Sequence, residues 1–263
     1  MQFTQDTHPV AGLADPVNAL VTGATSGIGL AMLRQLLHNR HVRRVAAVAL
    51  TTSTSAELAS LRAQVGERLQ LIDADLTNDD DLGRLAAAVS ERTGALHLVI
   101  NAAGMLHGAG IEPEKAIEQV SRANLEQVFA LNAFGPILLA KALMPVLGHG
   151  RPAVFASLSA RVGSIGDNRA GGWYAYRASK AAQNQLMKTF AIELARRNRH
   201  ACCLMLHPGT VDTPLSAPFQ ARVAPDALFS TERAALQLLE IIARSTAEDS
   251  GRFIAWDGSA VTW

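Results

Sequence analysis

The chain has 263 residues, which suits one large α/β domain, and 49% of them are hydrophobic, so a sizeable core can form without disulfides. Its 24 Lys and Arg residues nearly balance its 23 Asp and Glu residues, and the net charge of +1 excludes the strongly basic surface of a nucleic-acid-binding protein. The 8 histidines show no spacing typical of metal ligands, so we expect no metal site.

The cysteines and the N-terminus indicate the compartment. Cys202 and Cys203 are adjacent within an apolar run, and neighbouring side chains on a strand point to opposite faces, which disfavours a disulfide between them. Residues 1–15 lack the basic-then-apolar order of a signal peptide, and we find no apolar stretch long enough to cross a bilayer. We therefore expect a soluble, cytoplasmic protein with no membrane partner.

Continuous apolar runs alternate with segments of helical period from residue 18 onward. The predicted strands are residues 19–21, 45–50, 69–72, 96–101, 154–159, 202–206 and 253–255. The predicted helices are residues 28–39, 55–65, 79–92, 125–147, 174–197 and 231–245. This alternation predicts an α/β fold: a doubly wound (Rossmann) parallel sheet of about seven strands with helices on both faces. We interpret residues 1–263 as a single domain, with residues 1–17 as an N-terminal extension.

A glycine-rich loop, T-G-A-T-S-G-I-G at residues 22–29, joins the first predicted strand to the first predicted helix. Gly23, Gly27 and Gly29 allow tight turns and let a dinucleotide pyrophosphate approach the backbone N–H groups at the start of the helix. The spacing is G-x-x-x-G-x-G rather than the commoner G-x-G-x-x-G. Glycines also serve ordinary strand–helix turns, so the loop alone indicates a dinucleotide site without proving one.

Further motifs follow this loop in order. They are D-A-D-L-T at 73–77, N-A-A-G at 101–104, L-N-A-F-G-P at 131–136, Y-R-A-S-K at 176–180 and P-G-T-V-D-T at 208–213. Together, from residue 18 onward, they resemble the short-chain dehydrogenase/reductase family. Segments 163–168, 176–182 and 251–258 most resemble the C-factor and sniffer-like carbonyl reductases within it.

The resemblance implies a cofactor site and a catalytic set. The residues implied to bind NADP or NAD are Gly23, Thr25, Ser26, Gly27, Ile28, Gly29, Asp75, Leu76, Asn101, Ala102, Gly104, Tyr176, Lys180, Pro208, Gly209, Val211 and Thr213. The implied catalytic residues are Tyr176, Lys180, Asn132 and Ser159. By the same likeness Asp75 lies beside the adenine ring, and Asn132 holds a water that links Lys180 to solvent. Gly135 and Pro136 follow Asn132 closely, so we expect the helix to be distorted there.

Tyr176 and Lys180 stand four residues apart in a predicted helix and therefore share a face. A free tyrosine has a pKa of about 10, and a nearby cation favours the phenolate and lowers that pKa. Of the two tyrosines only Tyr176 has a lysine at this offset, because Ala178 follows Tyr174. An ordinary half-buried Tyr and surface Lys are the alternative, which the glycine loop and Asn132 make less attractive.

The serine of the catalytic set is displaced in this sequence. The family's serine lies three residues before a glycine, but three residues before Gly163 stands Ala160, and Ser159 lies one position earlier. A one-residue shift on a regular strand turns the side chain to the other face, although a bulge can re-aim it. We predict that Ser159 is the hydrogen-bond donor to the substrate oxygen. The alternative is that Ser159 is structural and the site lacks this donor.

The choice between NADP and NAD rests on the end of the second predicted strand. It reads Ala49-Leu50-Thr51-Thr52-Ser53, without the carboxylate that binds the ribose hydroxyls in NAD-preferring proteins. The arginine that NADP-preferring relatives often have there is also missing. We favour NADP, with Thr and Ser hydroxyls, Arg34 or Arg44 as candidate contacts of the 2′-phosphate.

Two functions follow from these residues. The first is an NAD(P)-dependent oxidoreductase that transfers a hydride between nicotinamide and a carbonyl or alcohol substrate, with Tyr176 as general acid/base. The second is a dinucleotide-binding signalling or regulatory protein with weak or no catalysis. The physiological substrate is not predicted, because loops 105–114 and 215–229 carry no diagnostic polar group.

Three structural questions stay open in the sequence. Trp173 is equally compatible with the substrate pocket and with the core. Residues 208–225 are either a binding loop or a wandering surface connection. The surplus of apolar residues on helices 125–147 and 174–197, which family members commonly pair across a two-fold axis, predicts a homodimer or homotetramer.

Overall fold

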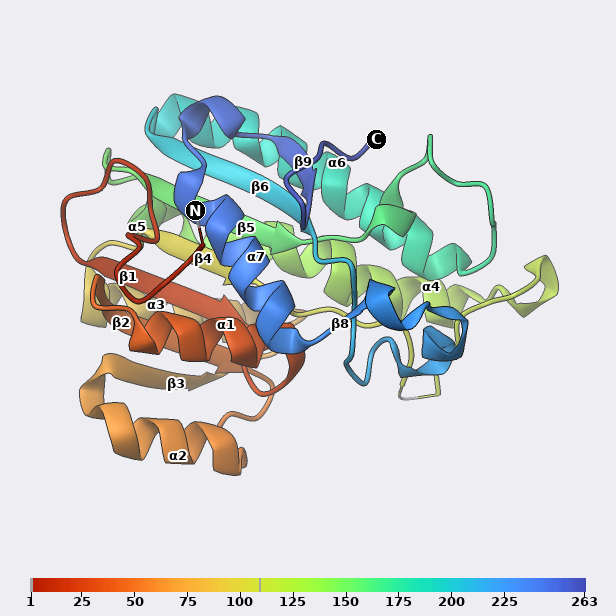
Figure 1. Ribbon diagram of the computed structural model, residues 1–263, viewed down its shortest axis with the longest axis horizontal. Coiled ribbons are helices and arrows are strands. Elements are labelled where there is room, and N and C mark those ends of the chain that lie inside the picture. The colour runs from red at the N-terminus through yellow and green to blue at the C-terminus, as the bar shows by residue number, and fades with distance from the viewer. Residues whose placement is uncertain (1, 109) are drawn as a thin grey trace.

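A computed structural model describes residues 2–108 and 110–263. Met1 of the N-terminal extension and Ala109 of the predicted loop 105–114 lie outside the described residues. The main sheet has seven parallel strands in the order β3-β2-β1-β4-β5-β6-β9. Their bounds are β1 Val17–Thr22, β2 Val42–Ala49, β3 Leu69–Asp73, β4 Leu98–Asn101, β5 Ala153–Leu158, β6 Ala201–His207 and β9 Arg252–Ala255. The predicted doubly wound fold is confirmed (Figure 1).

Helices cover both faces of the sheet. They are α1 Gly27–His38, α2 Ala56–Val65, α3 Asp79–Thr93, α4 Arg122–Phe129, α5 Gly135–Leu147, α6 Tyr174–Arg197 and α7 Thr231–Arg244. Apolar side chains of α1, α2 and α7 form one core cluster with the strands. Those of α3, α5 and α6 form a second cluster on the opposite face. Continuous apolar strands were the signal for this arrangement, and β1, β5 and almost all of β6 are buried.

The helix predicted at residues 125–147 is longer and more irregular than expected. It begins at Arg122, where the Ser121 side chain accepts a hydrogen bond from the backbone N–H of Asn124. Between α4 and α5 lies a π-helical turn, Ala130–Phe134, which contains Asn132. The predicted distortion of the helix is therefore present, and it lies in the turn that precedes Gly135 and Pro136. Such turns are frequent at functional sites.

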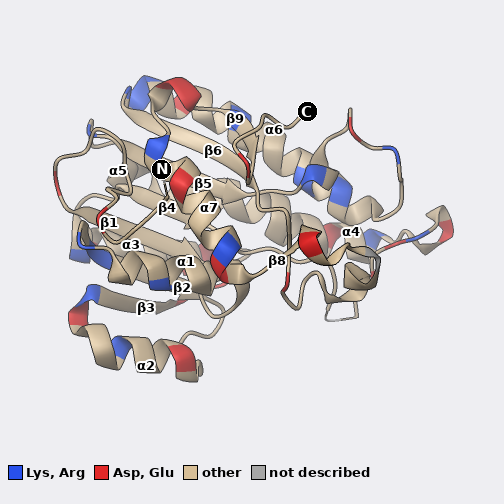
Figure 2. Cartoon of the chain, viewed as in Figure 1, with Lys and Arg blue, Asp and Glu red and all other residues tan. Residues whose placement is uncertain are grey.

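This same segment corrects one expectation about membranes. By length and composition the helix Arg122–Leu147 is apolar enough to cross a bilayer, contrary to our reading of the sequence. Half of its most apolar stretch is buried inside the fold, as in the core helices of soluble proteins. Charged side chains of both signs are scattered over the elements rather than gathered on one face (Figure 2).

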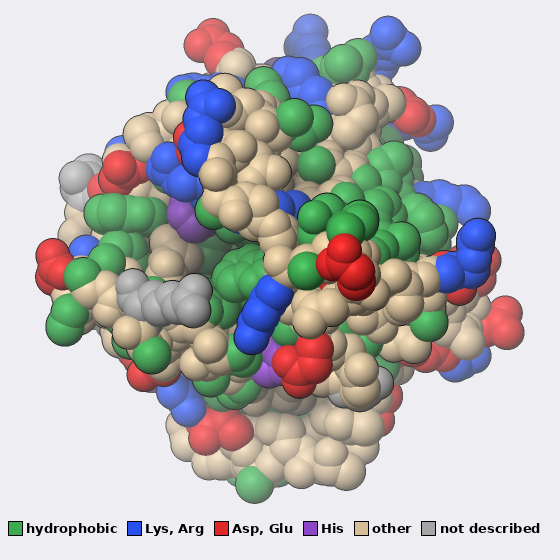
Figure 3. Space-filling view, turned by 90° about the vertical axis from the view of Figure 1, so that its right-hand side faces the viewer, with side chains coloured by type: hydrophobic (Ala, Val, Ile, Leu, Met, Phe, Trp, Pro, Cys, Tyr) green, Lys and Arg blue, Asp and Glu red, His purple; other side chains and the backbone are tan. Residues whose placement is uncertain are grey.

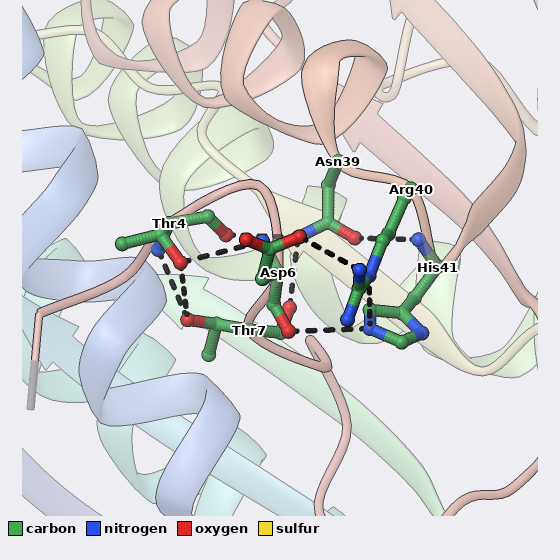
Figure 4. A network of polar contacts seen from close by, with 6 residues as sticks. All are labelled: Thr4, Asp6, Thr7, Asn39, Arg40 and His41. Atoms are coloured by element: carbon green, nitrogen blue, oxygen red, sulfur yellow. Dashed lines mark hydrogen bonds and ion pairs between the residues drawn. The ribbon is translucent and has the colours of Figure 1, made fainter.

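The N-terminal extension is packed against the domain. Phe3, Val10 and Leu13 are buried in the core cluster that includes α1. Asn39, at the end of α1, donates from its side-chain amide to the carbonyls of Thr4 (3.1 Å) and Thr7 (2.8 Å) (Figure 4). The extension therefore covers the end of the sheet at which the strands begin, opposite the end that carries the glycine loop.

Candidate active site

The glycine loop and the N-A-A-G segment lie side by side because β1 and β4 are neighbours. The strand order reverses between these two strands, and ligands of doubly wound folds bind at that point, beyond the carboxyl ends of the strands. Thr22 at the end of β1 donates a 2.7 Å hydrogen bond to the Asn101 side chain at the end of β4. This hydrogen bond fixes the positions of the two loops relative to each other at the opening of the site.

Each glycine of the loop has its own structural reason. Gly23 and Gly27 adopt positive φ angles of 63° and 56°, a region that favours glycine. Gly29 has an ordinary φ, but a Cβ there would lie 2.2 Å from the Gly23 carbonyl oxygen. Ser26 caps α1 with no side-chain hydrogen bond, so no side chain of the cap occupies the backbone N–H groups that begin the helix. This start of the helix can therefore receive an anion.

Three cavities that share lining residues follow one another at the carboxyl ends of the strands, and we name each after the group that the family resemblance implies it would hold. The adenosine cavity, at the end of β2, has a volume of about 530 Å³ and is lined by Leu50, Thr51, Asp75 and Leu76 among others. The nicotinamide cavity, about 370 Å³, is lined by the glycine loop, Gly104 and Lys180 among others. The substrate cavity, about 420 Å³, is lined by Ala160, Trp173 and Phe219 among others.

Most residues expected to bind the cofactor line these cavities. Asp75 and Leu76 line the adenosine cavity. The Asp75 carboxylate accepts hydrogen bonds from the backbone N–H and the hydroxyl of Thr77. Gly209 and Val211 line the substrate cavity instead. Asn101 is buried and lines none of the three cavities. Its side-chain amide accepts a hydrogen bond from Thr22 and donates one to Ser157. Asn101 therefore braces the strands beneath the site.

Tyr176 stands where the nicotinamide and substrate cavities meet, and it lines both. It belongs to the first turn of α6, which the preceding residues hold in place. Trp173 has a φ of +52°, the left-handed region, and its N–H donates to the carbonyl of Glu114. The buried Glu114 carboxylate also accepts the Ala175 N–H at 3.2 Å. The loop before α4 thus fixes the start of the helix that carries Tyr176.

Trp173 is a pocket residue rather than a core residue. Its ring lies 6.4 Å from that of Tyr176 and 4.9 Å from that of Phe219, measured between ring centroids. Phe219 belongs to the segment 208–225, which also contains β7 (Thr210–Val211), paired with β8 (Leu228–Phe229). The segment lines both the nicotinamide and substrate cavities. The segment is therefore a wall of these cavities and not a connection away from them.

Burial dominates the ionisation of Tyr176 and Lys180. The Lys180 Nζ atom lies 5.9 Å from the centroid of the Tyr176 ring. Burial raises the pKa of Tyr176 above its ordinary value, whereas it lowers the pKa of Lys180 to about 7. The expected lowering of the tyrosine pKa is thus not present in the protein without cofactor, because loss of solvation outweighs the attraction of the ammonium group.

A residue that the sequence analysis missed, Gln183, contacts Lys180 directly. Lys180 Nζ donates to the Gln183 side-chain oxygen at 2.9 Å and to the Leu158 carbonyl at 3.0 Å. The Gln183 amide in turn donates to Ser157 at 2.8 Å, and Ser157 also accepts from Asn101. A buried chain of hydrogen bonds therefore links Lys180 to the strand ends below the glycine loop. Gln183 stands three residues after Lys180, and this helical spacing could have indicated the contact between the two side chains.

We expect Gln183→Leu to lower kcat about tenfold, because it removes a charge-assisted hydrogen bond from a buried ammonium group. The same change should lower the pKa of Lys180 further, whereas Gln183→Glu should raise it by adding an anion. The measurement is the pH profile of kcat/KM for both variants. Gln185→Leu, an exposed position on the same helix, is the control. Wild-type profiles in both Gln183 variants would contradict this role.

Asn132 is buried beside the site but does not line the cavities. Its side chain accepts the Met105 N–H at 2.9 Å and donates to the Met105 carbonyl at 2.8 Å and to Ser179 at 3.1 Å. A methyl group at Gly104 would lie 3.3 Å from the Asn132 oxygen and 3.5 Å from Lys180 Nζ. Asn132 and Lys180 therefore approach the same glycine, and Asn132 fixes the loop at Met105 that lies between Asn132 itself and the cavity.

Ser159 lines both the nicotinamide and substrate cavities, and Ala160 lines the substrate cavity. The strand pairing continues through Ser159, whose N–H donates to Leu206. The Ser159 hydroxyl lies 2.6 Å from the side-chain oxygen of Asn184 on α6, while the Asn184 amide nitrogen is buried without a partner. Rotating that amide by 180° brings its NH₂ group to the serine oxygen and frees the hydroxyl proton for a ligand.

The groups suggested for a 2′-phosphate are mostly engaged elsewhere. The hydroxyls of Thr52 and Ser53 both donate to Asp73 at the end of β3. Arg34 forms an ion pair with Glu57 at 2.6 Å. Arg44 lies near the amino end of β2 and donates to the carbonyl of Arg92, away from the adenosine cavity. Thr51 lines the adenosine cavity, so it remains a candidate contact from this run of hydroxyl residues.

Comparison with known proteins agrees with this geometry. The family model described as "short chain dehydrogenase" matches residues 17–224. The chain is 32% identical to the 1-hydroxy-2-glutathionyl-2-methyl-3-butene dehydrogenase of a Rhodococcus species, covering 93% of this chain and 98% of that protein. It is 33% identical to the C-signal protein of Myxococcus xanthus, covering 68% of this chain and 99% of that protein.

Solved structures give the same result. The crystal structure of an NADPH-bound carbonyl reductase from chicken fatty liver superposes with a TM-score of 0.84 at 26% identity, covering 95% of this chain and all of that one. The expected likeness to C-factor and to Sniffer-like carbonyl reductases is confirmed. The chain therefore belongs to the short-chain dehydrogenase/reductase family of oxidoreductases.

Proposed function

We propose that the protein is an NADP(H)-dependent carbonyl reductase or alcohol dehydrogenase, acting on a small-molecule substrate. The observation that carries the proposal is the position of Tyr176, which lines both the nicotinamide and substrate cavities, whereas Lys180 lines only the first. A proton donor at this junction can reach a carbonyl oxygen in one cavity while a cofactor occupies the other.

The cavities fit a dinucleotide. Side chains at Gly23 or Gly27 would be strained by the positive φ angles and would approach Ala102 or Thr213, so the backbone is bared where a pyrophosphate would lie. Gly23, Thr25, Ser26, Gly27 and Ile28 would hold the phosphates. Asp75, Leu76 and Gly104 would hold the adenosine side, and Asn101 would brace the strands beneath the site. The nicotinamide side would be held by Ala102, Pro208 and Thr213, with Gly209 and Val211 beside it at the substrate cavity.

In the proposed mechanism the bound nicotinamide supplies or accepts the hydride. Tyr176 donates its phenolic proton to the carbonyl oxygen, or as phenolate removes the proton of an alcohol. The Lys180 ammonium group, held by Gln183, favours the phenolate. Ser159 donates a hydrogen bond to the same substrate oxygen once the Asn184 amide has turned. Trp173 and Phe219 shield the reacting atoms from water.

The proposed role of Ser159 predicts opposite effects at neighbouring positions. Ser159→Ala should lower kcat about a hundredfold or more, since removing one such donor typically costs about 3–4 kcal/mol of transition-state stabilisation. Ala160→Ser should change kcat less than threefold. Initial rates on a substrate that the wild type accepts provide the measurement. An unchanged rate in Ser159→Ala together with a tenfold gain in Ala160→Ser would show that position 160 is the donor site.

The preference for NADP(H) is proposed from the chicken carbonyl reductase and from the absence of a carboxylate at the end of β2. Leu50, 67% exposed, lines the adenosine cavity at the position next to the end of that strand. We expect Leu50→Asp to repel a 2′-phosphate and to shift the NADPH/NADH ratio of kcat/KM at least about tenfold toward NADH. Leu50→Asn is the uncharged control. An equal shift in both variants would argue against the electrostatic explanation.

The direct test of the proposed function is oxidation of NADPH and NADH, followed by absorbance, with a panel of aldehydes, ketones and quinones. The reverse reaction is tested with alcohols and the oxidised cofactors. Turnover by the wild type but not by Tyr176→Phe is the expected result. A folded protein that binds the cofactor and turns over no substrate in either direction would overturn the proposal.

A second candidate function is dinucleotide-dependent signalling, and the name of the C-signal relative refers to a signal. The observation in its favour is that the Ser159 hydroxyl is turned toward Asn184 and that position 160 carries no hydroxyl. The two functions differ in which residue a cellular effect requires. Signalling predicts that Tyr176→Phe preserves the effect while Gly27→Val abolishes it. Loss of the effect in Tyr176→Phe would favour catalysis.

We also propose a homodimer or homotetramer. Phe134, between α4 and α5, and Tyr174 and Ile192 of α6 are 50%, 40% and 52% exposed, so the two predicted interface helices carry large apolar side chains on the surface. A monomeric mass by light scattering at micromolar concentration would contradict this assembly.

Cys202 and Cys203 are free and buried, which supports the proposed cytoplasmic location.

A further inference from the structure

The substrate cavity combines an apolar wall with a cationic rim. Its wall includes Ile28, Leu106, Val162 and Leu215, together with the rings of Trp173 and Phe219. Three arginines also line it: Arg161, Arg169 and Arg177. Figure 3 shows the corresponding face of the molecule, with hydrophobic side chains gathered in a central hollow and Lys or Arg side chains beside it.

Acids balance these arginines only in part: Asp257, which does not line the cavity, lies near Arg161, and no ion pair forms between a described acid and Arg169 or Arg177. Asp167 is the single carboxylate among the described lining residues, and it pairs with Arg161 at 3.4 Å. Three cations and one anion leave a charge of +2 around this opening, although the whole chain carries only +1. His207, which also lines the cavity, adds no positive charge at neutral pH, because burial lowers its pKa to about 4.

Two of the three arginines are available to a ligand in different ways. Arg177 is held in place by donating from Nε to the carbonyls of Gly171 (3.1 Å) and Gly172 (3.0 Å), so its guanidinium group is already ordered. Arg169 makes no hydrogen bond or ion pair with any described residue. Glu114 does not line the cavity, and its carboxylate faces the positive N-terminal end of α6.

We propose that the substrate is an apolar aldehyde, ketone or alcohol that carries a carboxylate, with the carboxylate bound by Arg169 and Arg177 and the reacting carbon at Tyr176. This inference rests on the proposed oxidoreductase function and names its substrate class. Guanidinium groups bind carboxylates in bidentate geometry, and a partly enclosed site strengthens the attraction relative to open solvent. The apolar wall binds the part of the substrate between the two ends.

The test uses two aldehydes that differ in one charge, 4-carboxybenzaldehyde and its methyl ester. We expect the wild type to prefer the acid at least about tenfold in kcat/KM, and Arg169→Gln to lower the acid-to-ester ratio about tenfold. Arg177→Lys should lower it as well. Arg196→Gln, which removes a charge from the exposed far end of α6, should keep the wild-type ratio. Raising the salt concentration should lower the ratio in the wild type.

Binding separates this inference from the proposed function. If the wild type turns over neither these aldehydes nor any compound of the panel described above, the proposed function fails. The acid and ester are then compared by quenching of tryptophan emission in the cofactor-free protein, since Trp173 lines the cavity. Tighter binding of the acid that is lost in Arg169→Gln supports the carboxylate site. Equal preference for the two aldehydes, or an acid preference untouched by Arg169→Gln, overturns it.

Discussion

Replacing Tyr176 by phenylalanine should lower kcat for carbonyl reduction by about 10²–10⁴-fold, the contribution of a positioned general acid. The ring, which packs near Trp173, is retained, so binding of cofactor and the melting temperature should change little. Only the hydroxyl group, which carries the transferable proton, is removed. Steady-state rates and cofactor titration together provide the measurement, and a variant that kept more than a tenth of the wild-type kcat would exclude Tyr176 as the acid.

The pH dependence of the reaction should follow from the same residue. Burial raises the pKa of Tyr176, so the phenol needed for reduction stays protonated through neutral pH, and a change in the reduction rate near pH 7 should report Lys180, whose pKa burial lowers to about 7. Alcohol oxidation needs the phenolate and should therefore speed up as the pH rises. Opposite trends, with faster reduction and slower oxidation at high pH, would contradict the assignment.

The ionisation itself can be observed, because the chain has only two tyrosines. In a Tyr174→Phe background, ultraviolet absorbance near 295 nm follows Tyr176 alone. We expect a midpoint above the ordinary value of about 10 in the free protein and a lower midpoint with oxidised cofactor, whose ring carries a positive charge. An unchanged midpoint would show that the cofactor does not act on this hydroxyl.

Gly29→Ala should be the most damaging single methyl group in the chain. The added Cβ would lie 2.2 Å from the Gly23 carbonyl oxygen and 2.8 Å from the Gly23 carbonyl carbon, both backbone atoms that no side-chain rotation can move. Relief requires α1 to shift away from the turn that begins it. We expect a loss of about 3 kcal/mol or more in the free energy of unfolding and at least a tenfold weaker affinity for the cofactor.

Gly83→Ala is the matched control, since Gly83 lies within α3 with nothing within 4 Å of its added Cβ. That change should stabilise the protein by about 0.5–1 kcal/mol, because alanine favours the helix. Thermal melts and cofactor titrations of both variants decide the matter. Wild-type stability and affinity in Gly29→Ala would mean that α1 adjusts freely and that the glycine loop is not a tightly packed cradle.

The elements and the main catalytic pair were predictable because their signals are local. Buried strands show as continuous apolar runs, and Tyr176 and Lys180 share a helix face through a spacing of four residues. The observed ends of some elements differ from the predicted ends by a few residues, where contacts between distant segments determine the end. β2 begins at Val42 rather than residue 45, because Val42 and Arg44 pair with Val17 and Asn18 of β1 across a register shift that skips Arg43, which the mixed polarity of these residues did not indicate.

The contacts that tune the site were not predictable, because they join distant segments. Asn101 bonds to Thr22, 79 positions earlier, and Gln183 bonds to Ser157, 26 positions earlier. In sequence Gln183 is one polar residue among many on a long helix. The hydroxyls after β2 were assigned to the cofactor, but Asp73 on the neighbouring strand claims two of them.

The packed N-terminal extension joins segments that are far apart in the sequence. Val10 and Gly12 lie at the same surface hollow as Cys202 and Thr246, beside the amino ends of β5 and β6. Closing so long a loop costs more conformational entropy than forming a local contact, so we expect these contacts to form late in folding. The slow, non-local part of the fold is then on the side of the sheet farthest from the reacting atoms.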